Sequence, residues 1–263
     1  MQKIKNRSAG VAFAGWLLLG GLASDGQNLP SLKQVPVLCY HHIRALAPGK
    51  TSRDYEVTPG EFAAQMKALA TQGYKTVLPD QLYRYLKGGS GFAASPALPG
   101  WPSKPIIISF DDTDAEQYTV GKTEMEKYGF KGVFFIMTIS IGRPHYLTRE
   151  QIKALSDAGN TICCHTWDHH MVTKYSESDW TAQLIKPRRK LEDLIGKKIV
   201  DFAYPFGLWN QNAIDHLKKN GIRMAFQLSA KQSQSDPLYT VRRILVPGSW
   251  SVDRLLKAVQ NSF

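Results

Sequence analysis

The stretch Pro105-Ile106-Ile107-Ile108-Ser109-Phe110-Asp111-Asp112 decides the fold class of this chain. Its first six residues form a short apolar run rich in β-branched side chains, which predicts a buried strand. Two carboxylates follow at the carboxyl end of that strand. A second predicted strand, Thr161-Ile162-Cys163-Cys164, is followed in the same way by His165. Reactive side chains at the carboxyl ends of strands are typical of α/β barrels, whose active sites lie at that end of the sheet.

The rest of the 263-residue chain alternates between strand and helix signals. We expect strands near residues 35–40, 74–77, 105–110, 132–136, 160–164, 199–203, 222–227 and 240–246. Capping boxes predict helices that begin after Thr58 and Thr148, and further helices are expected over 115–128, 178–195, 210–220 and 252–259. Pro187 should kink or break one of them, and residues 88–104 should form a surface loop. This alternation predicts a parallel sheet covered by helices.

The two aspartates and the segment His165-Thr166-Trp167-Asp168-His169 supply the candidate chemistry. Successive side chains at a strand end point in different directions. One carboxylate can therefore hold a metal ion while its neighbour faces a bound water. Taken alone, an Asp-Asp pair is more often a turn or a helix cap, and a His-x-x-x-His pair is often a solvated helix face. Their position after two predicted strands favours a hydrolytic metal site with three protein ligands, an open position and a base.

These two segments resemble the first two motifs of the polysaccharide deacetylases of carbohydrate esterase family four, and the resemblance runs from about Val35 to about Val246. It implies an α/β fold, a single-domain distorted (β/α) barrel of seven strands. It also implies that Asp111 is the catalytic base. The metal ligands would be Asp112, His165 and His169. Such a site suits Zn²⁺, with Co²⁺ or Ni²⁺ as alternatives.

The third motif of that family is represented here by Ala203-Tyr204-Pro205-Phe206-Gly207. The resemblance implies that the backbone amide of Phe206 stabilises the oxyanion and that Tyr204 and Pro205 contact the substrate. Ala203 stands where the family has an arginine, so the group that steadies the base must come from elsewhere or be missing. Thr113 stands where the family has glycine after the two aspartates, which makes that turn stiffer.

One further segment indicates a particular branch of this family: Val37-Leu38-Cys39-Tyr40-His41-His42-Ile43. It is similar to the first strand of deacetylases that act on poly-β-1,6-N-acetylglucosamine, which implies that His41 is the general acid. The role of His42 stays open, and the two histidines could instead be structural or bind an adventitious metal. The last predicted strand, residues 241–246, contains no histidine, which fits this branch.

The expected activity is therefore metal-dependent removal of acetyl groups from N-acetylglucosamine units of a polysaccharide, with release of acetate. Three alternatives remain open at this point. The same motifs serve N-deacetylases of peptidoglycan or chitin, and they serve O-acetyl esterases of xylan. A non-catalytic glycan-binding protein is the third alternative, and the missing arginine at Ala203 is its best support.

The amino-terminal segment predicts export. Three cations precede an apolar run that ends in Gly21-Leu22-Ala23, which is the plan of a signal peptide over residues 1–23. A linker over 24–34 and a catalytic domain over 35–263 would follow. The expected location is the periplasm, the cell envelope or the medium, and a monomer is favoured.

The charge of the chain bears on its partners, and its cysteines bear on disulfide bonds. The formal charge of +11 comes partly from basic clusters on predicted helices, which are most often solvated faces. They would favour contact with anionic cell envelopes, and no motif points to a nucleic-acid partner. Cys39, Cys163 and Cys164 lie in apolar runs and are expected to be buried free thiols, although a bridge from Cys39 to one of the other two is the alternative.

Overall fold

The protein was analysed as a computed structural model that describes residues 34–45, 53–87 and 100–263. The expected signal peptide and most of the expected linker and surface loop lie outside these residues. No helix within the described ranges is long and apolar enough to cross a membrane.

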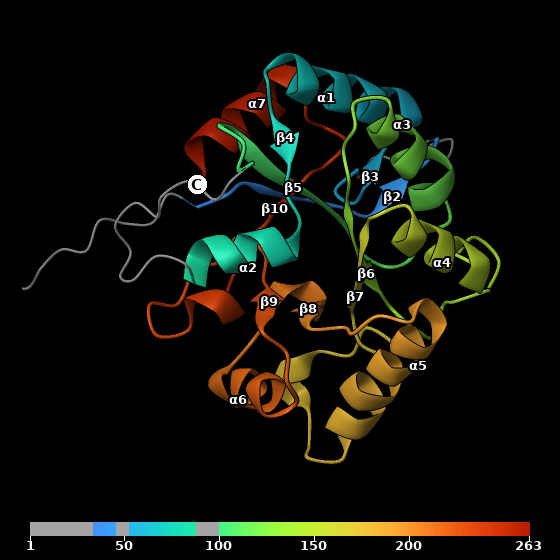
Figure 1. Cartoon of the computed structure of the whole chain (residues 1–263), viewed down its shortest axis with the longest axis vertical. Coiled ribbons are helices and arrows are strands. Elements are labelled where there is room, and N and C mark those ends of the chain that lie inside the picture. The colour runs from blue at the N-terminus through green and yellow to red at the C-terminus, as the bar shows by residue number, and fades with distance from the viewer. Residues whose placement is uncertain (1–33, 46–52, 88–99) are drawn as a thin grey trace, which may run out of the picture.

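A parallel sheet forms the centre of the described fold (Figure 1). Its strands follow the order β10-β1-β5-β6-β7-β8-β9, and β4 pairs with β5 beside this path. Their bounds are β1 (Val37–Tyr40), β4 (Lys75–Thr76), β5 (Pro105–Phe110), β6 (Val133–Ile136), β7 (Thr161–Cys164), β8 (Asp201–Ala203), β9 (Met224–Phe226) and β10 (Ile244–Leu245). All eight lie where the sequence predicts strands.

The sheet curls until its two ends meet. Leu38 of β1 is aligned with Ile244 of β10, and a bridge joins Phe226 of β9 to Val241 just before β10. Residues 241–245 therefore contact both edges of the sheet. This closure joins the seven strands of the main path into the expected distorted (β/α) barrel, with β4 as an eighth strand beside β5.

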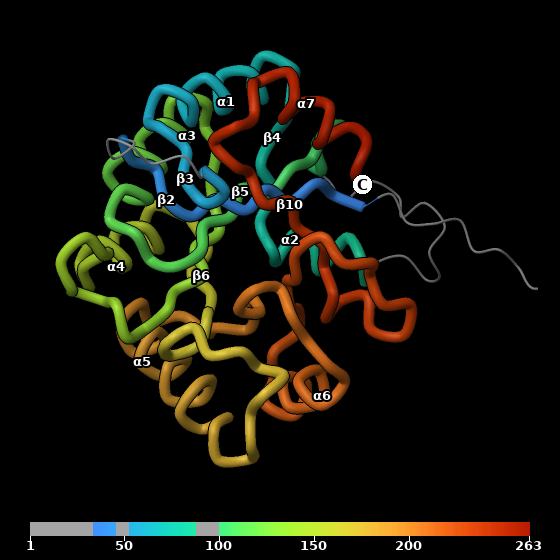
Figure 2. The backbone as a smooth tube through the Cα atoms, turned by 180° about the vertical axis from the view of Figure 1, so that it is seen from behind, coloured from blue at the N-terminus to red at the C-terminus, as the bar shows by residue number. Residues whose placement is uncertain are grey.

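Helices cover the outside of the sheet (Figures 1 and 2). They are α1 (Pro59–Thr71), α2 (Pro79–Lys87), α3 (Thr123–Glu126), α4 (Arg149–Asp157), α5 (Lys186–Ile195), α6 (Gln211–Lys219) and α7 (Val252–Asn261). The capping boxes predicted at Thr58 and Thr148 are both formed. Three elements are not predicted by the sequence: α2 and the paired two-residue strands β2 (His42–Ile43) and β3 (Glu56–Val57).

Two predicted helices contain π-helical turns. Residues Gln117–Lys122 form one such turn before α3, and Thr181–Ile185 form another before α5. Pro187 lies in the first turn of α5, where its missing N–H costs least. The break expected at Pro187 is thus a change from π-type to α-type hydrogen bonding along a helical path.

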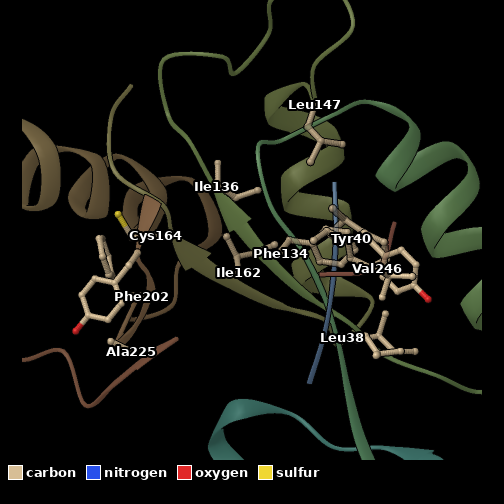
Figure 3. Close-up of a cluster of buried hydrophobic side chains, with 14 of the residues drawn as sticks. Leu38, Tyr40, Phe134, Ile136, Leu147, Ile162, Cys164, Phe202, Ala225 and Val246 are labelled. Carbon is tan, nitrogen blue, oxygen red and sulfur yellow. The ribbon is translucent and has the colours of Figure 1, made fainter. Parts of the chain in front are cut away.

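The alternation of side chains along the strands produces two apolar clusters. Leu38, Tyr40, Phe134 and Ile162 face the outer helices and belong to the larger cluster, shown in Figure 3. The intervening residues, such as Val37, face the barrel interior and form the smaller cluster. Cys39, Ser109 and Arg243 share this inward parity, so they continue the interior toward the carboxyl ends of the strands. All three are fully or almost fully buried.

The three cysteines are buried free thiols, as expected. Cys163 belongs to the inner cluster and Cys164 to the outer one, because adjacent strand residues face opposite sides. The alternative bridge from Cys39 is not formed.

Candidate active site

Three predicted metal ligands meet at the carboxyl end of the sheet. Asp112 follows β5, while His165 and His169 belong to the loop after β7. The Nε2 atoms of His165 and His169 each lie 3.6 Å from Asp112 Oδ1. Ligand atoms that surround one Zn²⁺ tetrahedrally are roughly 3.4 Å apart, given metal–ligand distances of about 2.1 Å. The three side chains are therefore spaced for one tetrahedral ion.

The polar atoms of this cluster also fit a metal. Among the described residues, Asp112 Oδ1 and His165 Nε2 are buried and have no hydrogen-bond partner. Buried polar atoms are rarely left unpaired in proteins. Burial and the neighbouring His165 lower the pKa of His169, which favours the neutral imidazole that binds metals.

Backbone geometry directs these ligands toward one point. The Nδ1–H of His165 donates to the carbonyl oxygen of Ala203 at 2.8 Å, which leaves Nε2 as the ligand atom. Left-handed backbone conformations shape both loops, at Asp112 after β5 and at Thr166 and His169 after β7. The His169 N–H donates to Thr166 Oγ1 at 2.9 Å and fixes the second histidine.

Asp111 is held by Arg243, a residue to which the sequence analysis assigned no role. The guanidinium donates from Nη1 to Oδ1 at 2.7 Å and from Nη2 to Oδ2 at 2.8 Å. Burial would raise the pKa of the Asp111 carboxyl, but the Arg243 charge holds that pKa well below its usual range. The arginine missing at Ala203 is thus replaced by an arginine from the closing segment of the barrel.

Arg243 is itself fixed from several sides. Its Nε donates to the Gln227 carbonyl oxygen at 3.0 Å, and its guanidinium carbon lies 5.0 Å from the centre of the Phe135 ring. Only 1% of the residue is exposed. The Asp111–Arg243 pair is therefore a buried, fully packed ion pair inside the barrel.

His41 lies beside this pair. It is 8% exposed, its Nδ1 is 4.0 Å from Cys39 Sγ, and its ring meets the ring of Tyr55 edge to face. A ring nitrogen of His41 lies within 4.8 Å of both the Cys39 sulfur and an Asp111 oxygen. Burial lowers the pKa of His41, while Asp111 and Asp112 oppose this effect.

His42 points to a different partner. Its Nδ1 pairs with Asp114 Oδ2. Because Asp114 follows β5 and His42 lies in β2, the pair joins the β2 segment to the loop that carries the aspartates. The structure thus gives the second histidine a structural contact outside the cluster of metal ligands.

A buried glutamine joins the segments that carry His41 and Asp111. The Gln117 side chain donates to the carbonyl oxygens of both His41 and Asp111. The glutamine is fully buried at the start of the π-helical turn after β5. It fixes the separation between the backbone of the proposed acid and that of the proposed base.

The third predicted motif forms the opposite wall. Phe206 has a left-handed backbone (φ 59°), its side chain is 54% exposed, and its ring packs against His169. A side chain at Gly207 would collide with Leu228, so the turn requires glycine there. Tyr204 borders the pocket, but its ring is fully buried and its hydroxyl donates to the Tyr239 carbonyl oxygen at 3.0 Å; Pro205 is buried too.

A pocket of about 420 Å³ connects these groups. It exposes the predicted metal ligands Asp112 and His169 on one side, and it extends past His41 toward Tyr55. The arrangement provides a metal-binding cluster, a carboxylate and an imidazole around one cavity. Such a cavity is equipped to hydrolyse an acyl bond.

Comparison with known proteins agrees with this geometry. Residues 100–225 match the family model for polysaccharide deacetylase. The chain is 27% identical over 234 residues to the poly-β-1,6-N-acetyl-D-glucosamine N-deacetylase of Staphylococcus epidermidis. The aligned region covers 80% of this chain and 78% of that protein. The chain therefore carries a polysaccharide deacetylase domain, and its motifs fit carbohydrate esterase family four. This makes it a hydrolase that acts on carbon–nitrogen bonds other than peptide bonds.

Solved structures share the fold. The deacetylase PplD of Streptococcus pyogenes, in complex with acetate, superposes with a TM-score of 0.74 at 22% identity, over 86% of this chain and 98% of that one. The IcaB structure from Ammonifex degensii gives a TM-score of 0.68 at 24% identity, over 86% and 97% of the two chains. The curled barrel is thus a fold already seen in deacetylases.

Proposed function

We propose that this chain is a metal-dependent N-deacetylase of poly-β-1,6-N-acetylglucosamine that works outside the cytoplasm. The observation that supports it most is the cluster of Asp112, His165 and His169, whose buried atoms lack other partners, beside the Asp111–Arg243 pair. The names of the staphylococcal relatives favour the β-1,6-linked polymer. The proposed place of action rests on the signal peptide predicted over residues 1–23.

The three ligands would hold one divalent ion, and zinc suits two imidazoles and one carboxylate. When bound, the ion would acidify water and polarise the acetamide carbonyl. Asp111 is placed to accept the proton of the attacking water, since it faces the same pocket and stays ionised through Arg243. The Phe206 backbone N–H would donate to the developing oxyanion.

His41 would protonate the departing amine. An amine leaves poorly as an anion, so a positioned acid speeds this step. The proposed acid and base approach the pocket from neighbouring strands, β1 and β5, and Gln117 fixes their backbones relative to each other. The products would be acetate and a glucosamine unit within the polymer.

The structure weakens the case for a non-catalytic glycan-binding protein. That alternative rests on the missing arginine at Ala203, and Arg243 supplies a guanidinium to the base from another strand. Acetate release should be measured on β-1,6-linked and β-1,4-linked N-acetylglucosamine oligomers and on acetylated xylan. The proposal expects the fastest release from the β-1,6-linked oligomer, and faster release from either other substrate would contradict the proposed specificity.

A further inference from the structure

A second hollow, of about 340 Å³, lies between the loops that follow β6 and β7 and the start of α5. Thr138 comes from the first loop and Trp167 from the second. The hollow is closed by Lys186, Pro187 and Lys190 of α5 and by Ala182 of the π-helical turn before it. The described chemistry of Asp111, His41 and the metal ligands does not use it.

Trp167 is held as an exposed platform. The residue is 44% exposed, although tryptophan is the largest apolar side chain. The backbone N–H of Trp167 donates to Gln183 Oε1 at 3.2 Å, and the backbone carbonyl oxygen of Trp167 accepts the Ile139 N–H at 2.8 Å. The backbone is thus fixed from two sides while the ring stays open to solvent. An exposed indole on a backbone fixed in this way can stack on the apolar face of a sugar ring.

The hollow lies next to the proposed metal centre. Trp167 is separated by one residue from each of His165 and His169. In both views α5 lies on one side of β6 and the β2–β3 pair on the other (Figures 1 and 2). The pocket with His41 extends toward β2 and β3. A polymer bound across the proposed metal centre would therefore contact the β2–β3 pair on one side of that centre and the Trp167 hollow on the other.

Charge in the hollow favours one kind of sugar. Lys190 Nζ donates to the Thr138 carbonyl oxygen at 3.1 Å, and Lys186 lies one helical turn before it. Two ammonium groups beside a stacked sugar can donate to hydroxyl and acetamide oxygens. They would repel the ammonium group of a glucosamine unit, which lacks its acetyl group.

We infer that the Trp167 hollow is a distal sugar subsite that binds an N-acetylated unit of the polymer and discriminates against a deacetylated one. This inference rests on the proposed function and extends it. Once a unit loses its acetyl group it would bind this subsite less well, so the subsite would direct the enzyme toward acetylated stretches.

The first test compares substrate lengths. The ratio of kcat/KM for a β-1,6-linked N-acetylglucosamine hexamer to that for the monosaccharide should fall about tenfold in Trp167→Ala, because one stacking platform is lost. Trp167→Phe keeps an aromatic face and should recover most of this ratio. Zinc content, measured on each variant, shows whether the neighbouring ligands are intact. An unchanged ratio in a zinc-replete Trp167→Ala variant would overturn the inference.

The second test compares charge states. Wild-type protein should prefer a fully acetylated hexamer to one with alternate units deacetylated, and Lys186→Gln with Lys190→Gln should reduce that preference about threefold. Lys198→Gln, an exposed lysine beyond the end of α5, is the matched control and should keep the wild-type preference. An equal preference in the double variant and the control would contradict the charge argument.

Binding separates failure of the subsite from failure of the proposed function. Calorimetry on chelator-treated full-length chain should show that the hexamer binds more weakly to Trp167→Ala than to wild type. If the variant binds the hexamer more weakly but wild-type protein releases acetate from no glycan, the proposed function is refuted and the subsite is supported. Acetate release with equal hexamer binding by both proteins would refute the subsite alone.

Discussion

Replacing Arg243 by methionine should destabilise this protein strongly. Methionine replaces the aliphatic part of the arginine side chain but removes both hydrogen bonds to Asp111 and the charge over Phe135. Asp111, only 3% exposed, would keep its carboxylate inside the barrel without the guanidinium that donates to both of its oxygens. Removing one partner of a buried ion pair costs about 3–5 kcal/mol.

That cost predicts a large fall in the melting temperature. For chains of this size each kcal/mol changes Tm by about 2–4 °C, so Arg243→Met should melt roughly 6–20 °C below wild type. Thermal unfolding should be followed by circular dichroism in the presence of chelator, so that bound metal does not add to the stability of either protein.

Two further variants make the measurement specific. Arg242→Met changes the neighbouring arginine, which faces outward toward Ser262 and Phe263, and should cost about 1 kcal/mol or less. Arg243→Met combined with Asp111→Asn removes both charges and should recover a large part of the lost Tm. If Arg243→Met melts within about 2 °C of wild type, or if the double variant is no better than the single one, the buried-pair argument fails.

The remaining predictions concern the metal, the acid, the glutamine and pH. Alanine at any one of the three metal ligands should remove bound zinc by elemental analysis, whereas His170→Ala, a 68% exposed neighbour, should retain it; retained zinc in all three ligand variants would exclude this site. His41→Ala should slow amide hydrolysis about a hundredfold or more but an activated ester far less, because only the amine needs a proton to leave; equal losses on both substrates would show that His41 is not the acid. Gln117→Leu should lower kcat about tenfold with a smaller change in KM, since the acid and base lose their common tether; an unchanged kcat would contradict this tether. The pKa of Asp111 is lowered on folding, so its contribution to stability should be present above about pH 4 and be lost as the pH falls further; acid unfolding of wild type compared with the double variant measures this, and identical pH profiles would contradict it.

Local sequence signals predict the strands and most helices well. The run before Asp111 and the alternation along the chain are strong because buried strands need β-branched apolar residues whatever their partners. The capping boxes at Thr58 and Thr148 are equally local. The short strands β2 and β3 have no such local signal. Each is formed only by pairing with the other, and the paired residues are 14 positions apart in the sequence.

The partner of Asp111 could not be assigned from local signals. Arg243 lies 132 residues further along the chain, and the two meet only because the barrel closes. One signal was nevertheless present in the sequence. In the strand predicted over 240–246, Val241 and Arg243 share a face, and a cation on the inward face of a barrel needs a buried carboxylate.

The cluster of Asp112, His165 and His169 was easier to anticipate than the surroundings of His41. Asp112, His165 and His169 lie directly after two strong strands, and parallel strands bring their carboxyl ends together. His41 and His42 are adjacent, and the sequence alone does not show which of them faces the active-site pocket. Tertiary contacts distinguish the two: His42 pairs with Asp114, whereas His41 faces the pocket.

We propose that the cluster of Asp112, His165 and His169 makes this chain a metal-dependent deacetylase of N-acetylglucosamine polymers. To test this, acetate released from a β-1,6-linked N-acetylglucosamine hexamer should be measured with chelator-treated protein before and after addition of one equivalent of Zn²⁺. Release should be lost on chelation and restored by zinc, with no restoration in His165→Ala. Full acetate release by metal-free protein, or none by zinc-replete protein, would contradict it.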